Sequence, residues 1–196
     1  MIPILDNGHA GMIGGKYETP GKRSPNWEKG VLYEGMFNRW FVNRLIEKMD
    51  RAGLKYFHVS PELNDVTLKT RVIRTNKIHQ KEKDVFLLCV HANAGGGRGI
   101  EVFTSPGNTK SDKIAEKVLI QIENDFRDVQ KMRFDFTDGD RDKESSFYVL
   151  KNTNCPAILL ECGFMDQKDD YLKLWSEKYL EDLVNSVFQV IQELQN

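Results

Sequence analysis

Hydrophobic positions along the chain follow two different spacings, which alternate from one segment to the next. Short apolar runs bounded by polar residues predict strands at residues 2–6, 55–59, 85–90, 99–104 and 157–160. Apolar residues at helical spacing predict helices at residues 33–52, 67–81, 111–126 and 177–194. In the first of these helices Phe37, Phe41, Leu45 and Met49 recur every fourth residue, and Gly53 follows where a helix would end. This alternation is typical of an α/β protein with a sheet flanked by helices.

The segments between these elements are less regular. Residues 8–30 are rich in Gly, Pro and polar residues and predict a long loop, a feature that is usually functional or disordered. Residues 127–146 are highly charged and are expected to form a solvated loop over 138–146, followed by an edge strand at 147–150. No internal repeat and no linker divides the chain, so we expect one domain covering residues 1–196.

Composition narrows the class of protein. The 196 residues include 28 Lys and Arg against 29 Asp and Glu, and 40% are hydrophobic. These values are typical of a globular protein and exclude a disordered tail, a collagen-like repeat and a highly basic nucleic-acid binder. No apolar run approaches the roughly 20 residues that a membrane helix needs. We therefore expect no nucleic acid partner, no membrane span and a monomer.

The cysteines and the first residues bear on the cellular compartment. Three cysteines, Cys89, Cys155 and Cys162, form no C-x-x-C pair, which favours buried free thiols over a disulfide framework. The chain reaches polar Asp6 after five residues, too early for the apolar core of a secretory signal. We therefore expect synthesis in the cytoplasm without a classical export signal.

Polar residues suited to catalysis stand at the ends of the predicted strands. His9 comes soon after the first strand, His91 directly follows the strand at 85–90, and Glu161 follows the strand at 157–160. Glu34 opens the first long helix. Ligands of open α/β sheets bind beyond the carboxyl ends of the strands, so these side chains are expected to meet. Two imidazoles and one carboxylate are typical of a catalytic zinc site, and a further carboxylate would serve as general base and acid.

Five segments in this order carry a resemblance to a known family. They are Leu5-Asp6-Asn7-Gly8-His9-Ala10-Gly11, Glu34-x-x-x-Asn38, Arg74-x-Asn76-Lys77, Val90-His91-Ala92-Asn93-Ala94, and Pro156-Ala157-Ile158-Leu159-Leu160-Glu161-Cys162-Gly163-Phe164. Together they resemble the zinc-dependent N-acetylmuramoyl-L-alanine amidases of the amidase-3 type and span residues 4–166. The resemblance implies a single open, mostly parallel twisted sheet flanked by helices. It also implies a peptidoglycan substrate, hydrolysed at the amide between N-acetylmuramic acid and L-alanine of the stem peptide.

The resemblance assigns roles to single residues. His9, Glu34 and His91 match the family's metal ligands, which hold one Zn²⁺ ion with a bound water, and Glu161 matches its catalytic glutamate. Five positions depart from the family pattern: Asn7, Ala10, Cys89, Asp166 and Gln167. None of these departures removes a ligand or the catalytic carboxylate.

Other residues compete for these roles. Glu28, on the same approach to the helix, and Glu18 are rivals of Glu34 as the carboxylate ligand. Acidic residues in a first helical turn often serve only the helix dipole, but the spacing of Glu34 and Asn38 favours Glu34. Glu101 is interpreted as a paired or rim carboxylate. His58 and His79 lie outside the motifs and are expected to be structural or surface residues.

Three further features allow other interpretations. Cys89 and His91 share a strand face, so a Cys–His nucleophilic hydrolase is an alternative mechanism. The glycine-rich residues 94–99 lack a nucleotide-loop ending and predict a flexible rim. Tyr17, Arg23 and Trp27 of the long loop are candidates for contacts with glycan or peptide, or simply exposed. Arg74 and Asn76 are expected to support helix packing.

Three functions therefore remain open. The amidase is favoured, a zinc peptidase acting on wall or free peptides uses the same metal set, and an inactive wall-binding module is disfavoured by Glu161. Two settings fit an amidase that lacks an export signal. One is a phage endolysin released through a holin-permeabilised membrane, which we favour, and the other is a bacterial cell-wall hydrolase.

Overall fold

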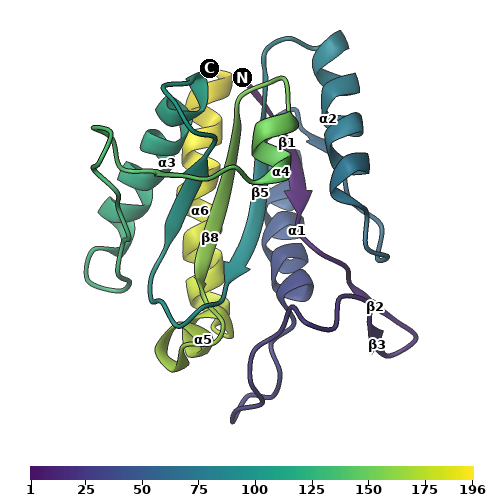
Figure 1. Ribbon diagram of the computed structural model, residues 1–196, viewed down its shortest axis with the longest axis vertical. Coiled ribbons are helices and arrows are strands. Elements are labelled where there is room, and N and C mark those ends of the chain that lie inside the picture. Colours follow the sequence, from purple (N-terminus) through teal and green to yellow (C-terminus); the bar gives the residue numbers. More distant parts are fainter.

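The computed structural model describes residues 1–196, and a six-stranded sheet forms its centre (Figure 1). Its strands, in spatial order, are β4 (Phe57–His58), β1 (Ile2–Asn7), β5 (Val85–Asn93), β8 (Ala157–Phe164), β6 (Glu101–Thr104) and β7 (Lys143–Glu144). The first four strands are mutually parallel, β6 runs antiparallel to β8, and β7 runs parallel to β6. The predicted α/β class with a mostly parallel sheet is confirmed.

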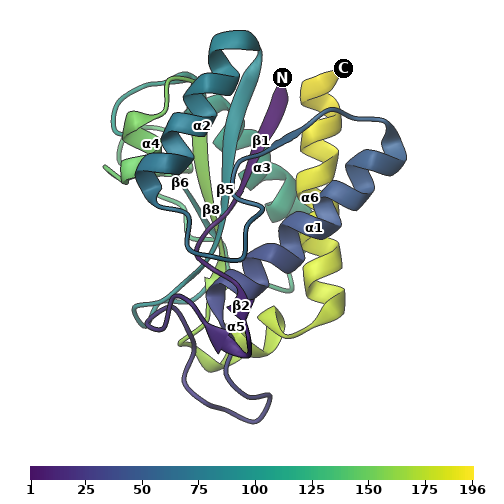
Figure 2. The same cartoon turned by 90° about the vertical axis from the view of Figure 1, so that its right-hand side faces the viewer.

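Helices cover both faces of this sheet, as Figure 2 shows from the side. One face carries α1 (Glu34–Ala52), α3 (Lys110–Phe126) and α6 (Glu177–Gln195), and the other carries α2 (Leu68–Lys81) and α4 (Tyr148–Asn152). The short helix α5 (Lys168–Leu174) follows β8 at the carboxyl end of the parallel strands. No helix is both long and apolar enough to cross a membrane.

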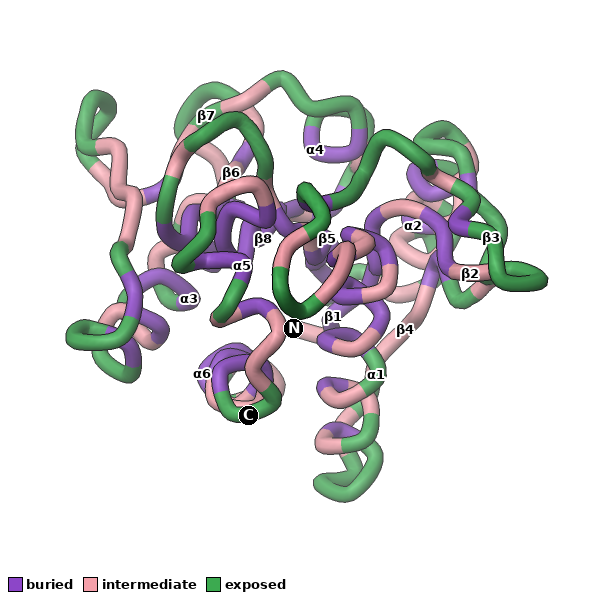
Figure 3. The backbone as a smooth tube through the Cα atoms, turned by 90° about the horizontal axis from the view of Figure 1, so that it is seen from below, coloured by how far each residue is buried: buried purple, intermediate pink, exposed green.

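Strand alternation divides the apolar residues between two cores. In β5, Phe86 and Leu88 belong to the 32-residue core beneath α1, α3 and α6. Leu87 and Cys89, on the opposite face, belong to an 11-residue core beneath α2 and α4. The backbone is buried through the central strands and exposed in the surrounding loops (Figure 3). Because both faces are covered, the central strands are apolar almost throughout, as parallel sheets require.

The helix boundaries agree with the sequence because their caps are local. Thr67 caps α2 by accepting a hydrogen bond from the Thr70 amide, and Thr109 forms a capping box with Asp112 at the start of α3. Gly53 ends α1 with a φ of 68°, a conformation that favours glycine.

Four expectations need correction. Residues 147–150 do not form an edge strand: Phe147 directly precedes helix α4, residues 148–150 belong to that helix, and the edge of the sheet is β7. The loop at 8–30 contains a small hairpin of β2 (Met12–Ile13) and β3 (Lys16–Tyr17). The strand expected at 55–59 is reduced to β4. Both β5 and β8 continue past their predicted ends, so His91 and Glu161 lie within strands rather than after them.

Candidate metal centre

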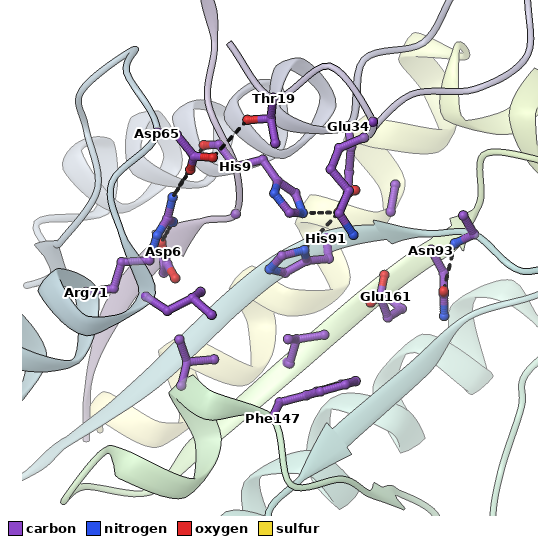
Figure 4. A pocket seen from close by; sticks show the side chains of 18 of the residues that line it. Asp6, His9, Thr19, Glu34, Asp65, Arg71, His91, Asn93, Phe147 and Glu161 are labelled. Atoms are coloured by element: carbon purple, nitrogen blue, oxygen red, sulfur yellow. Dashed lines mark hydrogen bonds and ion pairs between the residues drawn. The ribbon is translucent and has the colours of Figure 1, made fainter.

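His9, Glu34 and His91 meet at the carboxyl end of the parallel strands (Figure 4). Oε1 of Glu34 accepts hydrogen bonds from Nε2 of His9 at 3.1 Å and from Nδ1 of His91 at 2.8 Å. The two imidazole rings lie edge to face with their centroids 5.0 Å apart. One nitrogen of each histidine and one carboxylate oxygen lie within 4.8 Å of one another.

Three separate elements deliver these side chains. His9 stands in the turn after β1, His91 near the end of β5, and Glu34 at the first position of α1. The turn passes close to His91: a Cβ atom at Gly8 would lie 2.2 Å from Cε1 of the His91 ring. Only glycine therefore leaves space for His91 at this point.

The backbone of His9 is held in an unusual conformation. Its φ of 67° lies in the left-handed region, which costs a residue with a Cβ about 1–2 kcal/mol. Nη1 of Arg39 donates to the His9 carbonyl at 3.0 Å, and Nη2 of Arg71 approaches the same oxygen at 3.5 Å. Nδ2 of Asn38 donates to the Gly8 carbonyl at 2.8 Å. These bonds fix the turn that aims His9 at the other two side chains.

A buried ion pair between Asp6 and Arg71 supports the turn that carries His9. The Asp6 carboxylate accepts hydrogen bonds from the Arg71 guanidinium and from the Ser60 hydroxyl, and both members of the ion pair are buried. Arg71 also donates to the Val66 carbonyl at 2.7 Å. The sequence does not identify Asp6 and Arg71 as a pair, since no local spacing links positions that lie 65 residues apart.

The contacts within this group change the pKa values of Glu34 and His91. Burial alone would raise the pKa of Glu34, but the hydrogen bonds from the two imidazoles outweigh burial and lower this pKa to about 2. Burial opposes protonation of His91, but its bond to Glu34 prevails and raises the His91 pKa. Glu34 is therefore an anion at neutral pH, the form that binds a cation.

Glu161 stands beside this group without a partner. In the register of the sheet it pairs with His91 on β5 and with Glu101 on β6. Its side chain is buried, and its Oε2 atom makes no hydrogen bond. Burial, which the negative charges of Glu34 and Glu101 reinforce, raises the pKa of Glu161 to about 8.

Glu101, by contrast, is fully paired. Its carboxylate accepts hydrogen bonds from Asn93 at 2.5 Å and from Nε of Arg133 at 2.7 Å, and Nζ of Lys143 lies 2.7 Å away. The interpretation as a paired carboxylate is therefore confirmed. Because its charge is compensated in this way, Glu101 is not available as a second base.

The donor set fits a zinc ion. Two imidazole nitrogens and a carboxylate oxygen converge on one point, and these are ligand atoms that catalytic zinc takes. The buried, unpartnered oxygen of Glu161 lies next to the same group, where a catalytic site needs a free base. The residues predicted as ligands are thus brought together, and the predicted catalytic residue stands beside them.

A cavity of about 800 Å³ opens over this group. One side is lined by residues of the loop before α1, including Thr19, Lys22 and Arg23. In Figure 4, Phe147 lies across the cavity from Thr19, and its neighbour Tyr148 also lines the cavity. The volume is typical of a site for a small ligand or a segment of a polymer.

The rival residues have other roles. Glu28 is exposed and pairs with Lys168, and Glu18 is exposed, so neither takes part in the cluster. His58 bonds to Asn7 and is half-buried. His79 is a half-buried residue of α2, so both histidines lie outside the cluster.

Of the three candidates in the long loop, only Arg23 lines the cavity. Tyr17 is buried and its hydroxyl accepts a hydrogen bond from the Gly35 amide, and Trp27 packs edge to face on Tyr171. Arg74 pairs with Glu62, and Asn76 joins α2 to the segment after α4. Both therefore support packing, as expected.

The structure does not support a cysteine nucleophile or a phosphate-binding loop. Burial raises the pKa of the Cys89 thiol well above its usual value, and the thiol donates to Asp6 at 3.5 Å, so it is a poor nucleophile. In the glycine-rich segment the amides of Gly95 and Gly96 both donate to one oxygen of Asp166. These amides are therefore already bound to a carboxylate and do not form a phosphate site.

Fold and site together define an open α/β protein with a candidate two-histidine, one-carboxylate metal centre at the carboxyl ends of its parallel strands. The model of the amidase-3 family, described as N-acetylmuramoyl-L-alanine amidase, matches residues 4–193. The chain therefore belongs to the N-acetylmuramoyl-L-alanine amidase family.

Individual relatives agree with this assignment. The N-acetylmuramoyl-L-alanine amidase CwlM of Bacillus licheniformis is 36% identical over 115 residues, which are 56% of this chain and 40% of that protein. The endolysin of Bacillus phage SPP1 is 25% identical over 174 residues, which are 86% of this chain and 62% of the endolysin. The chain thus matches less than two thirds of the length of either relative. Among solved structures, an N-acetylmuramoyl-L-alanine amidase from Clostridium difficile 630 shares the fold, with a TM-score of 0.75, 24% identity, and coverage of 98% of this chain and 95% of that one.

Proposed function

We propose that this protein is a zinc-dependent hydrolase that cleaves the amide bond between N-acetylmuramic acid and L-alanine of the peptidoglycan stem peptide. The observation that carries the proposal is the convergence of His9, Glu34 and His91 next to the unpartnered carboxylate of Glu161. Membership of the amidase family supports the choice of this bond.

His9, Glu34 and His91 would hold the ion through two nitrogens and one oxygen. When bound, Zn²⁺ supplies Lewis acidity, which polarises an amide carbonyl and lowers the pKa of water. The carboxylate of Glu34 is already anionic at neutral pH, so the site carries the charge that a cation needs. Asp6, Arg39 and Arg71 keep the His9 turn in place while the substrate binds.

Glu161 acts as the base and then as the acid. Its free Oε2 takes a proton from the attacking water as the carbon–oxygen bond forms, and returns a proton to the L-alanine nitrogen as the carbon–nitrogen bond breaks. A cation held by the neighbouring cluster would lower the pKa of Glu161 from about 8, because an opposite charge favours the carboxylate. The pKa would then lie closer to neutral pH, where one group can perform both transfers.

The substitution Glu161→Gln tests this role. We expect the variant to keep its zinc content and to lose about 10²- to 10⁴-fold in turnover, which is the usual contribution of a general base. Glu18→Gln is the matched control, since Glu18 is exposed and lies outside the cavity, and it should keep both properties. Full activity of Glu161→Gln would disprove the role of Glu161.

The bond is identified by mass analysis of purified peptidoglycan after digestion, with and without a chelator. An amidase releases peptides with new L-alanine amino termini and leaves the glycan intact, and the chelator stops the release. Cleavage between two amino acids would indicate a zinc peptidase instead. Binding to the wall without any release would indicate an inactive wall-binding module.

The similarity to a phage endolysin supports a lytic role, with the cell wall as the place of action. Co-expression with a holin should then lyse the host, and the Glu161→Gln variant should not. Absence of lysis with an active enzyme would favour a bacterial cell-wall hydrolase.

A further inference from the structure

Two basic side chains line the cavity without a charge partner. Lys22 and Arg23 are both exposed, and neither side chain forms a hydrogen bond or ion pair within the chain. Arg71 is the only other Lys or Arg of the lining, and its guanidinium is occupied by Asp6 and by backbone carbonyls. Lys22 and Arg23 are therefore the cations of this cavity that remain free for a ligand.

The backbone fixes these two residues next to the metal centre. The amide of Glu34, the candidate ligand, donates to the Lys22 carbonyl at 3.0 Å. Arg23 forms a bridge with Tyr33, and the Ser24 amide donates to the Leu32 carbonyl at 2.8 Å. The main chain of this segment is thus tied to the start of α1, while both basic side chains stay free to move.

Three of the four acidic residues of the lining are already paired within the chain, and the fourth, Glu161, is buried and forms no ion pair with Lys22 or Arg23. Asp6 is bound to Arg71, and Asp65 accepts a hydrogen bond from the Thr19 hydroxyl at 3.2 Å. Glu34 is bound to the two histidines. Across the cavity, Phe147 and Tyr148 present aromatic surface and no charge. The cavity therefore has a cationic side and an uncharged aromatic side.

We propose that Lys22 and Arg23 form a carboxylate-binding subsite that takes a free carboxylate of the substrate's peptide portion, within one or two residues of the scissile amide. This inference rests on the proposed function, because the peptide is the part of that substrate that bears carboxylates near the bond. A guanidinium binds a carboxylate in a bidentate manner, and an ammonium adds a mobile point charge. With the cations on one side only, an acidic peptide enters the cavity in one orientation.

Two synthetic N-acetylmuramoyl peptides test the subsite. They differ only in the residue after L-alanine, which carries either a free carboxylate or a neutral carboxamide. We expect kcat/KM of the wild-type enzyme to be roughly ten-fold higher for the carboxylate, since each exposed ion pair contributes at most a factor of about five. The difference should lie mainly in KM and should shrink at high salt, because exposed charges are screened.

The variant Lys22→Ala/Arg23→Ala should reduce this ratio to about one, and the swap Lys22→Arg/Arg23→Lys should keep most of it. Lys29→Ala is the matched control, since Lys29 is exposed, belongs to the same loop and does not line the cavity. It should keep both the ratio and the rate. Thermal unfolding of each variant shows whether the fold is retained.

The outcomes separate the two proposals. If the wild-type enzyme cleaves both peptides equally well, the subsite is disproved and the amidase stands. If the preference survives in Lys22→Ala/Arg23→Ala, the assignment to these residues is wrong. If the zinc-loaded enzyme cleaves neither peptide, the proposed function fails and the subsite fails with it.

Discussion

The close approach of Gly8 to His91 allows a sharp test of the metal centre. In the substitution Gly8→Ala the new Cβ would lie 2.2 Å from Cε1 and 2.3 Å from Nε2 of the His91 ring. Non-bonded carbon atoms prefer separations of about 3.5 Å or more, so the ring must retreat by roughly 1.3 Å. Metal–ligand distances tolerate only about 0.2 Å, so His91 would no longer reach an ion held by the other two ligands.

We expect zinc affinity to fall at least about 100-fold, which is the upper end for disturbed support of a metal ligand. Competition with a zinc-binding dye measures this affinity, and circular dichroism checks that the fold is retained. Gly21→Ala is the matched control: Gly21 lines the same cavity, but its added Cβ would meet nothing within 4 Å. It should bind zinc as tightly as the wild-type protein.

Wild-type zinc affinity in Gly8→Ala would refute the assignment of His91 as a ligand. Equal losses in Gly8→Ala and Gly21→Ala would refute the steric argument, because the two sites differ in the space around the added methyl group. A loss confined to Gly8→Ala supports both.

Three further predictions concern charge and burial elsewhere in the chain. Burial raises the pKa of Asp142 from 3.8 to about 7, so its contribution to stability is full below pH 4 and is lost as the pH rises to 7. In Asp142→Asn the amide oxygen can still accept from Thr104, so the urea midpoint of this variant should depend less on pH between pH 4 and 8 than that of the wild-type protein. An unchanged pH profile would contradict this. Asp6→Asn leaves the buried Arg71 charge without its partner and should cost about 3–5 kcal/mol in urea unfolding, whereas Asp84→Asn at an exposed pair should cost less than about 1 kcal/mol; equal costs would argue against the buried pair. All three cysteines are buried and their thiol pKa values are raised, so iodoacetamide should not modify the folded protein or reduce its activity. A chelator should remove the activity. The reverse pattern would indicate a cysteine nucleophile.

Local periodicity predicted the long elements because their signals lie within a few residues. The stripe of Phe37, Phe41, Leu45 and Met49 turns one face of α1 towards the core, and these residues are fully buried. Elements of two to five residues carry too little pattern to decide their type. Residues 147–150 are apolar and suit a strand or a helix equally, and contacts with the sheet and with α2 decide for α4.

The sequence also predicts the ends of β5 and β8 too early. Because His91 and Glu161 are polar, the pattern predicts that each strand ends before them, but the hydrogen-bond ladder between β5 and β8 continues through both residues. The register shifts between His91 and Asn93, but Asn93 still pairs with Phe164, so the two strands stay hydrogen-bonded beyond these polar side chains. The consequence for the site is that both residues are held by sheet hydrogen bonds and are more rigid than loop residues would be.

What the sequence determined by itself was the class of fold, the order of the long elements, and the four polar residues that the motifs mark as a catalytic set. Tertiary structure alone decided how these residues are oriented and supported. Arg39 and Arg71 reach the His9 carbonyl from positions 30 and 62 residues away, and Lys22 shares a cavity with Phe147 and Tyr148 at the start of α4. Such contacts depend on how the sheet brings distant segments together, and no spacing within one segment records them.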